Sequence, residues 1–449
     1  MKCDFCKVWI PIILLVGIGF YVASLFVEPP PPTELRIATG REGGAYYAFA
    51  QEYKQHLEEQ GVTLDIQQTA GSVEALEYLL ADKVSAAFVQ GGTAASFKEA
   101  SDKLSAVASL FYEPLWLFYR VEQPTNYLSD LRGKKIAVGE EGSGGHVLAL
   151  QLLKDNQVTK ENTSFMEISN QKAVEQLIAG EIDAAFFVIS PTAELIPILL
   201  NDPNIKLMSF KRALAYSGRY KFLTRVIIGE GMLDLENNLP REDKILLAAT
   251  ANLVVRNDIH PDLIRLLLKQ AIKVHKNGGL LEEQGIFPSA NLTELPINKN
   301  AAQYLKSGPP WLENIFPFWL ASMIDRLKIM LIPLLTLMLP LFKGAMPVYR
   351  WRIRSKIYRW YGLVRDIDRQ ADELSESKTV EPRKRLEMIE EEIKRFKMVQ
   401  KELNDQVSVP LSYMGEFYTL RLHLLLISNR LKESRAEIIA FLKAQEAKS

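Results

Sequence analysis

Apolar and polar positions follow two alternating periods between about residues 35 and 306. Short runs of β-prone apolar residues are each followed by a segment in which apolar residues recur every three or four positions. This alternation of strands with amphipathic helices is typical of an α/β fold with mainly parallel strands. We expect strands at the clearest runs, which are residues 35–39, 64–68, 86–89, 135–138 and 184–188.

A longer apolar run precedes this region. Residues 8–27, VWIPIILLVGIGFYVASLFV, carry no charge, and at about 1.5 Å per residue a helix of this length crosses a hydrocarbon core of about 30 Å. Lys2 and Lys7 precede the run, which places the N-terminus (residues 1–7) in the cytoplasm. A cleaved signal peptide is the alternative, with a small-residue site at 22–24, but the run is longer than signal peptides need. We expect an uncleaved anchor and, at 28–34, a stiff Pro-rich linker.

A second apolar run follows the α/β region. Residues 329–342, IMLIPLLTLMLPLF, are uncharged, and we expect a second transmembrane helix over 323–349 that Pro333 and Pro340 kink. The basic and aromatic stretch 349–360 comes directly afterwards and places the C-terminal side in the cytoplasm as well. Nucleic-acid binding is the alternative for this stretch, and its place beside a span disfavours it. The aromatic residues expected to form a belt before the helix are Trp311, Phe316, Phe318 and Trp319.

The last hundred residues, 350–449, are charged and have helical periodicity. Pro382 suits a first helical turn, and a break near Pro410 separates two apolar stripes. We expect a cytoplasmic α-helical region built as an α-hairpin that packs on itself or on a second copy.

Charge and cysteine content narrow the class of protein. The chain has 54 Lys and Arg against 54 Asp and Glu, so that 54 − 54 leaves no net charge to attract nucleic acid. Its two cysteines, Cys3 and Cys6, lie before the first apolar run, and a lone CxxC is too little for a metal site or a disulfide framework.

Four strand-to-helix corners recur in the α/β region, and they carry the candidate chemistry. They lie at 40–47, 69–72, 139–146 and 190–192. Each places free backbone N–H groups and a helix N-terminus at the carboxyl end of a strand, where the corners of a parallel sheet converge on one crevice. A single corner of this kind is also read as an ordinary tight turn; the repetition favours a two-sided clamp for a small anion.

Other chemistries lack their patterns. No corner fits GxGxxG or GxxxxGK[ST], the histidines are scattered without a second ligand at helical spacing, and no Ser–His–Asp or Cys–His pairing is marked. We therefore expect no metal, no cofactor and no enzymatic activity. His146 is read as structural, and Arg41 as either solvent-exposed or paired with a ligand carboxylate.

The order of IATGREGGAYY, TAGSVEAL, AAFVQGG, LFYEPLWLFYR, LRGKKIAVGEEGSGG and GEIDAAFF resembles the TAXI family of solute-binding proteins of TRAP transporters. The resemblance covers about residues 35–306, and the tail resembles a long, membrane-anchored subgroup. It implies a two-lobed, type II periplasmic-binding-protein-like fold with lobe 1 at 35–120 and 220–300 and lobe 2 at 121–215. We expect the chain to cross between the lobes near Tyr119 and Tyr216.

The resemblance also implies residues that line the cleft between the lobes. Ala75 and Gly145 depart from the polar residues that the family often has there, which leaves the ligand open. Together with the glycines of the first corner, the expected ligand-binding residues are Gly40, Gly43, Gly44, Tyr46, Tyr47, Thr69, Gly71, Ser72, Gln90, Gly142, Ser143 and Gly144.

The expected function is that of a receptor in the cytoplasmic membrane of a bacterium, with a periplasmic binding domain and both termini cytoplasmic. It would bind a small carboxylate or amino acid by lobe closure and dock on TRAP membrane permease subunits. The alternative is a sensor that signals through the cytoplasmic helical region.

Overall fold

The computed structural model describes residues 2–25, 29–122, 125–376, 380–406 and 413–446. The end of the expected first span, Glu28 of the linker and the expected break at Pro410 lie outside these residues. The chain forms two compact units, Pro29–Met323 and a second one that combines Met1–Glu28 with Ile324–Ser449.

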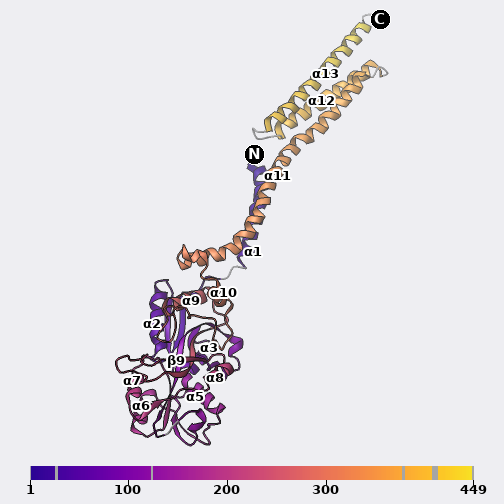
Figure 1. Ribbon diagram of the computed structural model, residues 1–449. Helices are drawn as coiled ribbons and strands as arrows, with labels where there is room; N and C mark the ends of the chain where they lie inside the picture. The colour runs from indigo at the N-terminus through magenta and orange to yellow at the C-terminus, as the bar shows by residue number, and fades with distance from the viewer. Residues whose placement is uncertain (1, 26–28, 123–124, 377–379, 407–412, 447–449) are drawn as a thin grey trace. The chain divides into compact units, whose positions relative to one another are not determined.

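The first unit is built on one mixed ten-stranded sheet (Figure 1). Its strand order is β2-β1-β3-β10-β4-β7-β5-β6, with β8 beside β4 and β9 beside β10. The strands are β1 (Glu34–Thr39), β2 (Thr63–Gln68), β3 (Ala86–Gln90), β4 (Leu104–Arg120), β5 (Lys135–Ala137), β6 (Ser164–Met166), β7 (Ala184–Val188), β8 (Ile205–Leu207), β9 (Thr224–Ile228) and β10 (Lys244–Arg256).

Helices connect and cover these strands. The first unit contains α2 (Ala45–Glu58), α3 (Ser72–Leu80), α4 (Ala100–Lys103), α5 (Gly144–Asp155), α6 (Asn170–Ala179), α7 (Leu195–Asn201), α8 (Ala213–Arg219), α9 (Pro261–His275) and α10 (Lys299–Ser307), with the short 3₁₀ helices η1 (Ala94–Ser96), η2 (Leu128–Leu131) and η3 (Trp311–Asn314).

Two long antiparallel strands divide the first unit into two lobes. The N-terminal half of β4 and the C-terminal half of β10 belong to lobe 1, together with β1, β2 and β3, while the other halves belong to lobe 2, with β5 to β9. In Figure 1, α2 and α9 lie on one lobe and α5, α6 and α7 on the other. The expected α/β strands are present, but the sheet is mixed rather than mainly parallel, because β4 and β10 run against their neighbours.

The hydrophobic cores mark where the chain crosses between lobes. Leu110 and Leu253 are buried in the core of lobe 1, whereas Leu115 and Ala249 are buried in the core of lobe 2. The crossings therefore lie inside β4 and β10, not near Tyr119 and Tyr216 as expected. β10 is a buried run without a polar break at its crossing, and β4 is interrupted there only by the partly buried residues Phe111, Tyr112 and Glu113, which form no turn.

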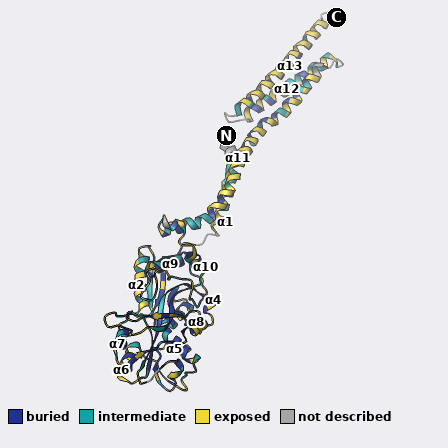
Figure 2. Ribbon diagram, in the orientation of Figure 1, coloured by how far each residue is buried: buried dark blue, intermediate teal, exposed yellow. Residues whose placement is uncertain are grey.

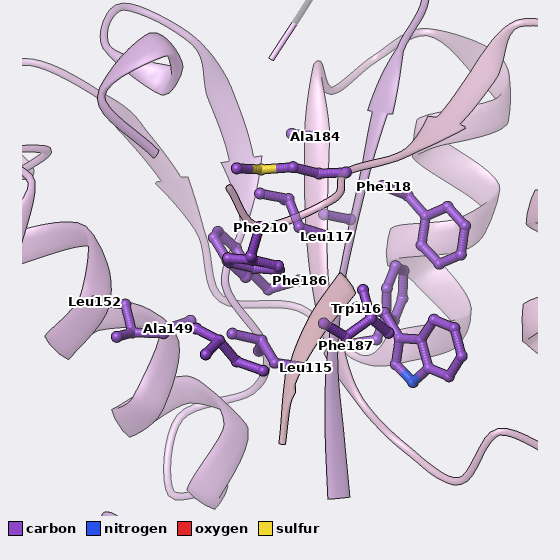
Figure 3. Close-up of a cluster of buried hydrophobic side chains, with 14 of the residues drawn as sticks. Leu115, Trp116, Leu117, Phe118, Ala149, Leu152, Ala184, Phe186, Phe187 and Phe210 are labelled. Atoms are coloured by element: carbon purple, nitrogen blue, oxygen red, sulfur yellow. The ribbon is translucent and has the colours of Figure 1, made fainter. Parts of the chain in front are cut away.

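Aromatic side chains fill the centre of lobe 2 (Figure 3). Trp116 stacks on Phe118 at 6.3 Å between ring centroids, and Phe118 meets the edge of Phe187 at 6.0 Å. The Trp116 indole N–H donates to the Ile189 carbonyl at 3.0 Å, so this large side chain is buried without losing its hydrogen bond. Packing of this kind fixes the lobe as a rigid body.

The described residues of the second unit are almost all helical. It contains α1 (Lys2–Ser24), most of α11 (Phe318–Glu376), α12 (Pro382–Gln406) and α13 (Met414–Glu446). One of its helices is long and apolar enough to cross a membrane, Met330–Glu373, whose most apolar stretch has a mean hydropathy of 1.7 and is 11% buried; Trp9–Ser24 is a shorter apolar helix. In Figure 2, exposed residues occur along the length of these helices. Contacts of Trp9 with Phe342 and of Gly19 with Leu337 pack α1 antiparallel to α11.

The C-terminal region is more extensive than expected. Pro333 and Pro340 lie inside the single 59-residue helix α11. The expected hairpin is formed by α12 and α13, and α11 adds a third helix to it, because Ile357 and Trp360 of α11 are buried in the same core. The helical spacing of apolar residues that identified α12 and α13 also continues through the basic stretch at 349–360, but the many charged residues there made it difficult to recognise.

The expected aromatic belt before the apolar helix is only partly exposed. Trp311 is 63% exposed, but Phe318 is 4% exposed and packs in the core of lobe 1. The Trp319 indole N–H donates to the Gln60 carbonyl at 2.6 Å, and Ser322 donates to the Asp262 carboxylate. These contacts fix the first turns of α11 on lobe 1.

Candidate functional site

A cavity of about 730 Å³ lies between lobes 1 and 2. Its volume is within the range of sites for small molecules, about 300–1,000 Å³. The crossing region of β4, the strand ends of both lobes and the segment after α9 contribute to its wall.

The first corner presents the N-terminus of α2 to the cavity. Gly43 has φ +86°, a conformation that favours glycine, and the Gly44 N–H donates to the Arg41 carbonyl at 3.0 Å to close the turn. Ala45 and Tyr46, the first helical residues, line the cavity. The turn thus directs unpaired N–H groups of the helix toward a ligand.

The second and third corners touch each other across the cleft. The Val73 N–H at the start of α3 donates to the Gly142 carbonyl at 3.3 Å. A Cβ on Gly71 would lie 2.8 Å from the same carbonyl, so the lobes approach as closely as glycine permits. An ion pair joins the same two sides, since Arg41 Nη1 lies 2.9 Å from Glu140 Oε2. The lobes are therefore in a closed arrangement.

The N-terminus of α5 meets the end of β3 at the cavity. Ser143 caps the helix by accepting from the His146 N–H at 3.2 Å. A Cβ on Gly144 would lie 2.7 Å from Cβ and 2.9 Å from Oε1 of Gln90. Gln90 is 5% exposed, and its Nε2 has no acceptor among the described residues.

The fourth corner contributes hydroxyl groups instead of a long helix. Ser190 Oγ and Thr192 Oγ1 are 2.8 Å apart, and both residues line the cavity. Helix α7 after them has seven residues.

A partly buried carboxylate lies on the crossing strand β4. The Tyr46 hydroxyl donates to Glu113 Oε2 at 2.8 Å. Burial raises the pKa of Glu113 to about 7, against the opposing effect of this hydrogen bond. Burial also raises the pKa of Tyr46 well above its usual value, and the Glu113 charge adds to the effect, so Tyr46 stays protonated as a donor.

Helix α9 ends in a histidine that is part of an aromatic wall. Phe111 stacks on His275 at 5.6 Å between ring centroids, and Phe49 meets its edge at 4.6 Å. Burial lowers the pKa of His275 to about 4, so its imidazole is neutral near pH 7. The wall is apolar in character and includes Phe186 and Phe287 from other elements.

The charged residues of the cavity wall are all acidic. Glu113, Glu140 and Glu282 line it, and the described lining contains no lysine or arginine. Glu140 is paired with Arg41, and Glu282 accepts from the Tyr112 N–H at 2.8 Å. An anion in this cavity would depend on N–H groups, hydroxyls and helix N-termini.

An internal example shows that corners of this chain can hold a carboxylate by N–H groups alone. Glu294 accepts from the N–H groups of Gly92, Ala94 and Ala95 at 2.9, 3.0 and 2.7 Å, at the corner after β3. Burial raises the pKa of Glu294 while these three bonds lower it.

A model of the NMT1-like family matches residues 37–305, from β1 to α10. The chain belongs to the NMT1-like family. The matched residues are those of the two lobes, whose mixed α/β sheet has a periplasmic-binding-protein-like fold.

Three solved structures are similar over part of this NMT1-like chain. A protein from Bordetella bronchiseptica RB50 has 16% identity and a TM-score of 0.39, covering 56% of this chain and 73% of its own. The alkanesulfonate-binding protein SsuA from Xanthomonas axonopodis pv. citri, bound to MOPS, has 14% identity, coverages of 55% and 74% and a TM-score of 0.35. The amino acid ABC transporter substrate-binding protein AbpA from Streptococcus pneumoniae, bound to L-arginine, has 17% identity, coverages of 55% and 91% and a TM-score of 0.35.

The structure brings most of the expected site residues of this NMT1-like protein together. Tyr46 lines the cavity and Tyr47 does not, because successive residues of α2 project from different sides of the helix. Thr69 and Gly142 act behind the wall, where the Thr69 hydroxyl donates to the Thr39 carbonyl at 2.6 Å and Gly142 contacts the other lobe. Of the residues expected to bind ligand, those that line the cavity are Gly40, Gly43, Gly44, Tyr46, Gly71, Ser72, Gln90, Ser143 and Gly144.

Sequence reasoning missed the floor of the cavity and its aromatic wall. Glu113 and Phe111 lie on β4, and His275 and Glu282 come from the end of α9 and the segment after it. One signal in the sequence pointed to Glu113: it is a glutamate inside the otherwise apolar run LFYEPLWLFYR. His146 is buried behind the corner and does not line the cavity. Among the residues that the structure describes, no three His, Cys, Asp or Glu side chains form a metal cluster.

Proposed function

We propose that residues 29–323 are the receptor domain of a transport system and bind a small carboxylate by closure of two lobes. The observation that carries this proposal is the convergence of the N-termini of α2, α3 and α5 on one interlobe cavity. Helix N-termini favour anions, and the cavity wall offers no cationic side chain that would do so instead. The carboxylate of Glu294, held by three N–H groups, is an internal parallel.

The wider setting follows from the resemblance to the membrane-anchored subgroup of the TAXI family. The chain is anchored in the cytoplasmic membrane of a bacterium by spans at 8–27 and 323–349, with the receptor domain in the periplasm and both termini in the cytoplasm. The closed receptor docks on TRAP permease subunits, and it catalyses no reaction.

Isothermal calorimetry on the full-length chain in detergent tests the binding step. The panel consists of amino acids, dicarboxylates and monocarboxylates, and at least one is expected to bind saturably with one site per chain. The absence of saturable binding by every member contradicts the proposal.

A sensor is the second candidate, and one observation favours it. Helix α11 begins in the core of lobe 1 with Phe318 and continues without interruption to Ile357 in the three-helix bundle. A continuous helix is a suitable element to pass a conformational change from the receptor domain to the bundle. Deletion of 361–449 separates the candidates: unchanged uptake with a lost cellular response supports sensing, and lost uptake supports a role in transport.

A further inference from the structure

One end of the cavity has an unused hydrogen-bond donor. Gln90 Nε2 is buried without an acceptor among the described residues, and its side chain lies against Gly144 at the start of α5. The first N–H groups of a helix have no acceptor within the helix. Gln90 and the α5 N-terminus therefore form a site for a hydrogen-bond acceptor, and a carboxylate satisfies all of these donors at once.

The floor of the cavity, formed by Glu113, favours a positively charged group of the ligand. A chain of hydrogen bonds leads to Glu113. The backbone N–H of Gln90 donates to Ser72 Oγ at 3.0 Å, the Ser72 hydroxyl bonds to the Tyr46 hydroxyl, and the Tyr46 hydroxyl donates to Glu113 Oε2 at 2.8 Å. Every donor in this chain points toward Glu113. Among the described residues, Tyr46 donates to Glu113 Oε2 only, and Glu113 lines the cavity, so its carboxylate can accept further hydrogen bonds from a ligand.

No cationic side chain of the described cavity wall neutralises Glu113. That wall has no lysine or arginine, and Arg41 of the first corner is paired with Glu140. A buried carboxylate without a cationic partner is costly to ionise, which the raised pKa of Glu113 reflects. An ammonium group on the ligand would remove this cost, whereas a second ligand carboxylate would add to it.

The remaining wall is apolar and aromatic. Phe49, Phe111 and His275 contact one another, and the imidazole is neutral. Phe186 and Val188 of β7 line the cavity on the lobe 2 side. This surface offers apolar contacts to the part of a ligand that is neither carboxylate nor ammonium.

We infer that the ligand is a zwitterionic α-amino acid with a large apolar side chain, bound by its ammonium group on Glu113 and by its carboxylate at Gln90 and the α5 N-terminus. The inference rests on the proposed function and narrows it, because it excludes dicarboxylates and glutamate as preferred ligands. Glu113 determines this specificity.

Calorimetry on the full-length chain at pH 8 tests the inference with four probes that differ in one feature each. L-Phenylalanine has both charged groups, 3-phenylpropanoate lacks the ammonium, phenethylamine lacks the carboxylate, and glutarate has two carboxylates. A charge-assisted hydrogen bond at a buried site contributes about 1.5–3 kcal/mol, which is about 10- to 100-fold in affinity. We expect L-phenylalanine to bind tighter than 3-phenylpropanoate by this factor, and glutarate and phenethylamine to bind more weakly than L-phenylalanine.

The Glu113→Gln variant keeps the shape of the side chain and removes its charge. We expect it to lose about 10- to 100-fold in affinity for L-phenylalanine and none for 3-phenylpropanoate. Glu52→Gln, the same change on the exposed face of α2, is the matched control and should bind like the wild type. Equal affinity of the wild type for L-phenylalanine and 3-phenylpropanoate, or an unchanged affinity in Glu113→Gln, overturns the inference.

The outcomes separate this inference from the proposed function. Binding of glutarate or 3-phenylpropanoate without preference for L-phenylalanine contradicts the inference and leaves the proposed function standing. No binding of any carboxylate by the wild type contradicts both.

The pH dependence of the wild type is a second measurement that does not require a folded variant. The other titratable groups of the wall are Tyr46, Tyr112, Glu140, His275 and Glu282. His275, with its pKa lowered to about 4, does not titrate between pH 6 and 8, and burial raises the pKa of both tyrosines. Because Glu113 must be ionised to accept an ammonium, affinity for L-phenylalanine should rise by about tenfold from pH 6 to 8. A constant or falling affinity over this range overturns the inference.

Discussion

Gly144 is the residue at which a single methyl group should hold the lobes apart. A Cβ at this position would lie 2.7 Å from Cβ of Gln90 and 2.9 Å from its Cδ and Oε1. Ordinary contact begins near 3.4 Å, and Cβ of Gln90 is fixed by its backbone, so the two sides must separate by about 0.7 Å (3.4 − 2.7). Gly144 has no positive φ, so the substitution causes no backbone strain of its own.

The clash exists only when the lobes are closed. Gln90 ends β3 in lobe 1, whereas Gly144 begins α5 in lobe 2. Overpacking of this kind costs about 1–3 kcal/mol, and this cost falls on the closed state alone. Gly144→Ala should therefore weaken ligand binding by about 5- to 150-fold, while the thermal stability of the unliganded open protein stays within a degree or two of the wild type.

Calorimetry with the tightest ligand of the amino-acid panel, together with thermal unfolding without ligand, measures both quantities. Gly218→Ala is the control, because a Cβ there would meet no atom within 4 Å and Gly218 does not line the cavity. It should bind ligand within about threefold of the wild type. Wild-type affinity in Gly144→Ala, or equal losses in both variants, would refute the idea that this contact limits closure.

Three further predictions concern charge, the interlobe ion pair and the helical bundle. Because burial raises the pKa of Glu113 from 4.5 to about 7, its contribution to the stability of the unliganded protein is present below pH 4.5 and lost as the pH rises through 7. Comparison of urea unfolding of the wild type and Glu113→Gln at pH 5 and 8 should show a change of about 2.5 kcal/mol in the difference between their free energies of unfolding. Arg41→Ala removes the exposed ion pair with Glu140, which is worth about 0–1 kcal/mol. It should therefore reduce ligand affinity less than Tyr46→Phe, which removes the hydrogen-bond donor to Glu113. Calorimetry showing the reverse ranking would mean that the ion pair holds the lobes closed. Leu420→Ala removes a fully buried side chain from the bundle and should destabilise it by about 2–5 kcal/mol in a two-transition melt, with ligand affinity unchanged; a loss of affinity would show coupling between bundle and cavity.

Local patterns predicted the strands and helices of the corners, because each is marked by a change of period and a glycine or hydroxyl turn. The crossing points were not predicted, since β4 and β10 are long, largely buried strands whose halves pair with different lobes. Such pairing depends on contacts far apart in the chain, which a local pattern does not encode. The bundle was underestimated for a related reason: the periodicity of α11 continues through a stretch dominated by charge.

The candidate site divides in the same way. Residues at corners, such as Gly44 and Ser143, were predicted because turn chemistry is visible in sequence. The choice between Tyr46 and Tyr47 depends on the rotation of α2, which one turn of helix does not specify. Glu113 was missed because its importance comes from burial on a strand that closes the cavity, a property of the assembled lobes.

The central claim, ligand-dependent closure of the two lobes, is tested most directly by an interlobe distance. Cysteines for spin labels are placed at two exposed positions, Glu52 of α2 and Glu175 of α6, in a chain whose Cys3 and Cys6 are replaced by serine. Pulsed electron paramagnetic resonance then measures the distance between the two labels. We predict a broad distribution without ligand that becomes narrower and shorter when a binding amino acid or carboxylate is added. An unchanged distribution at a saturating concentration of a ligand that calorimetry shows to bind would contradict closure.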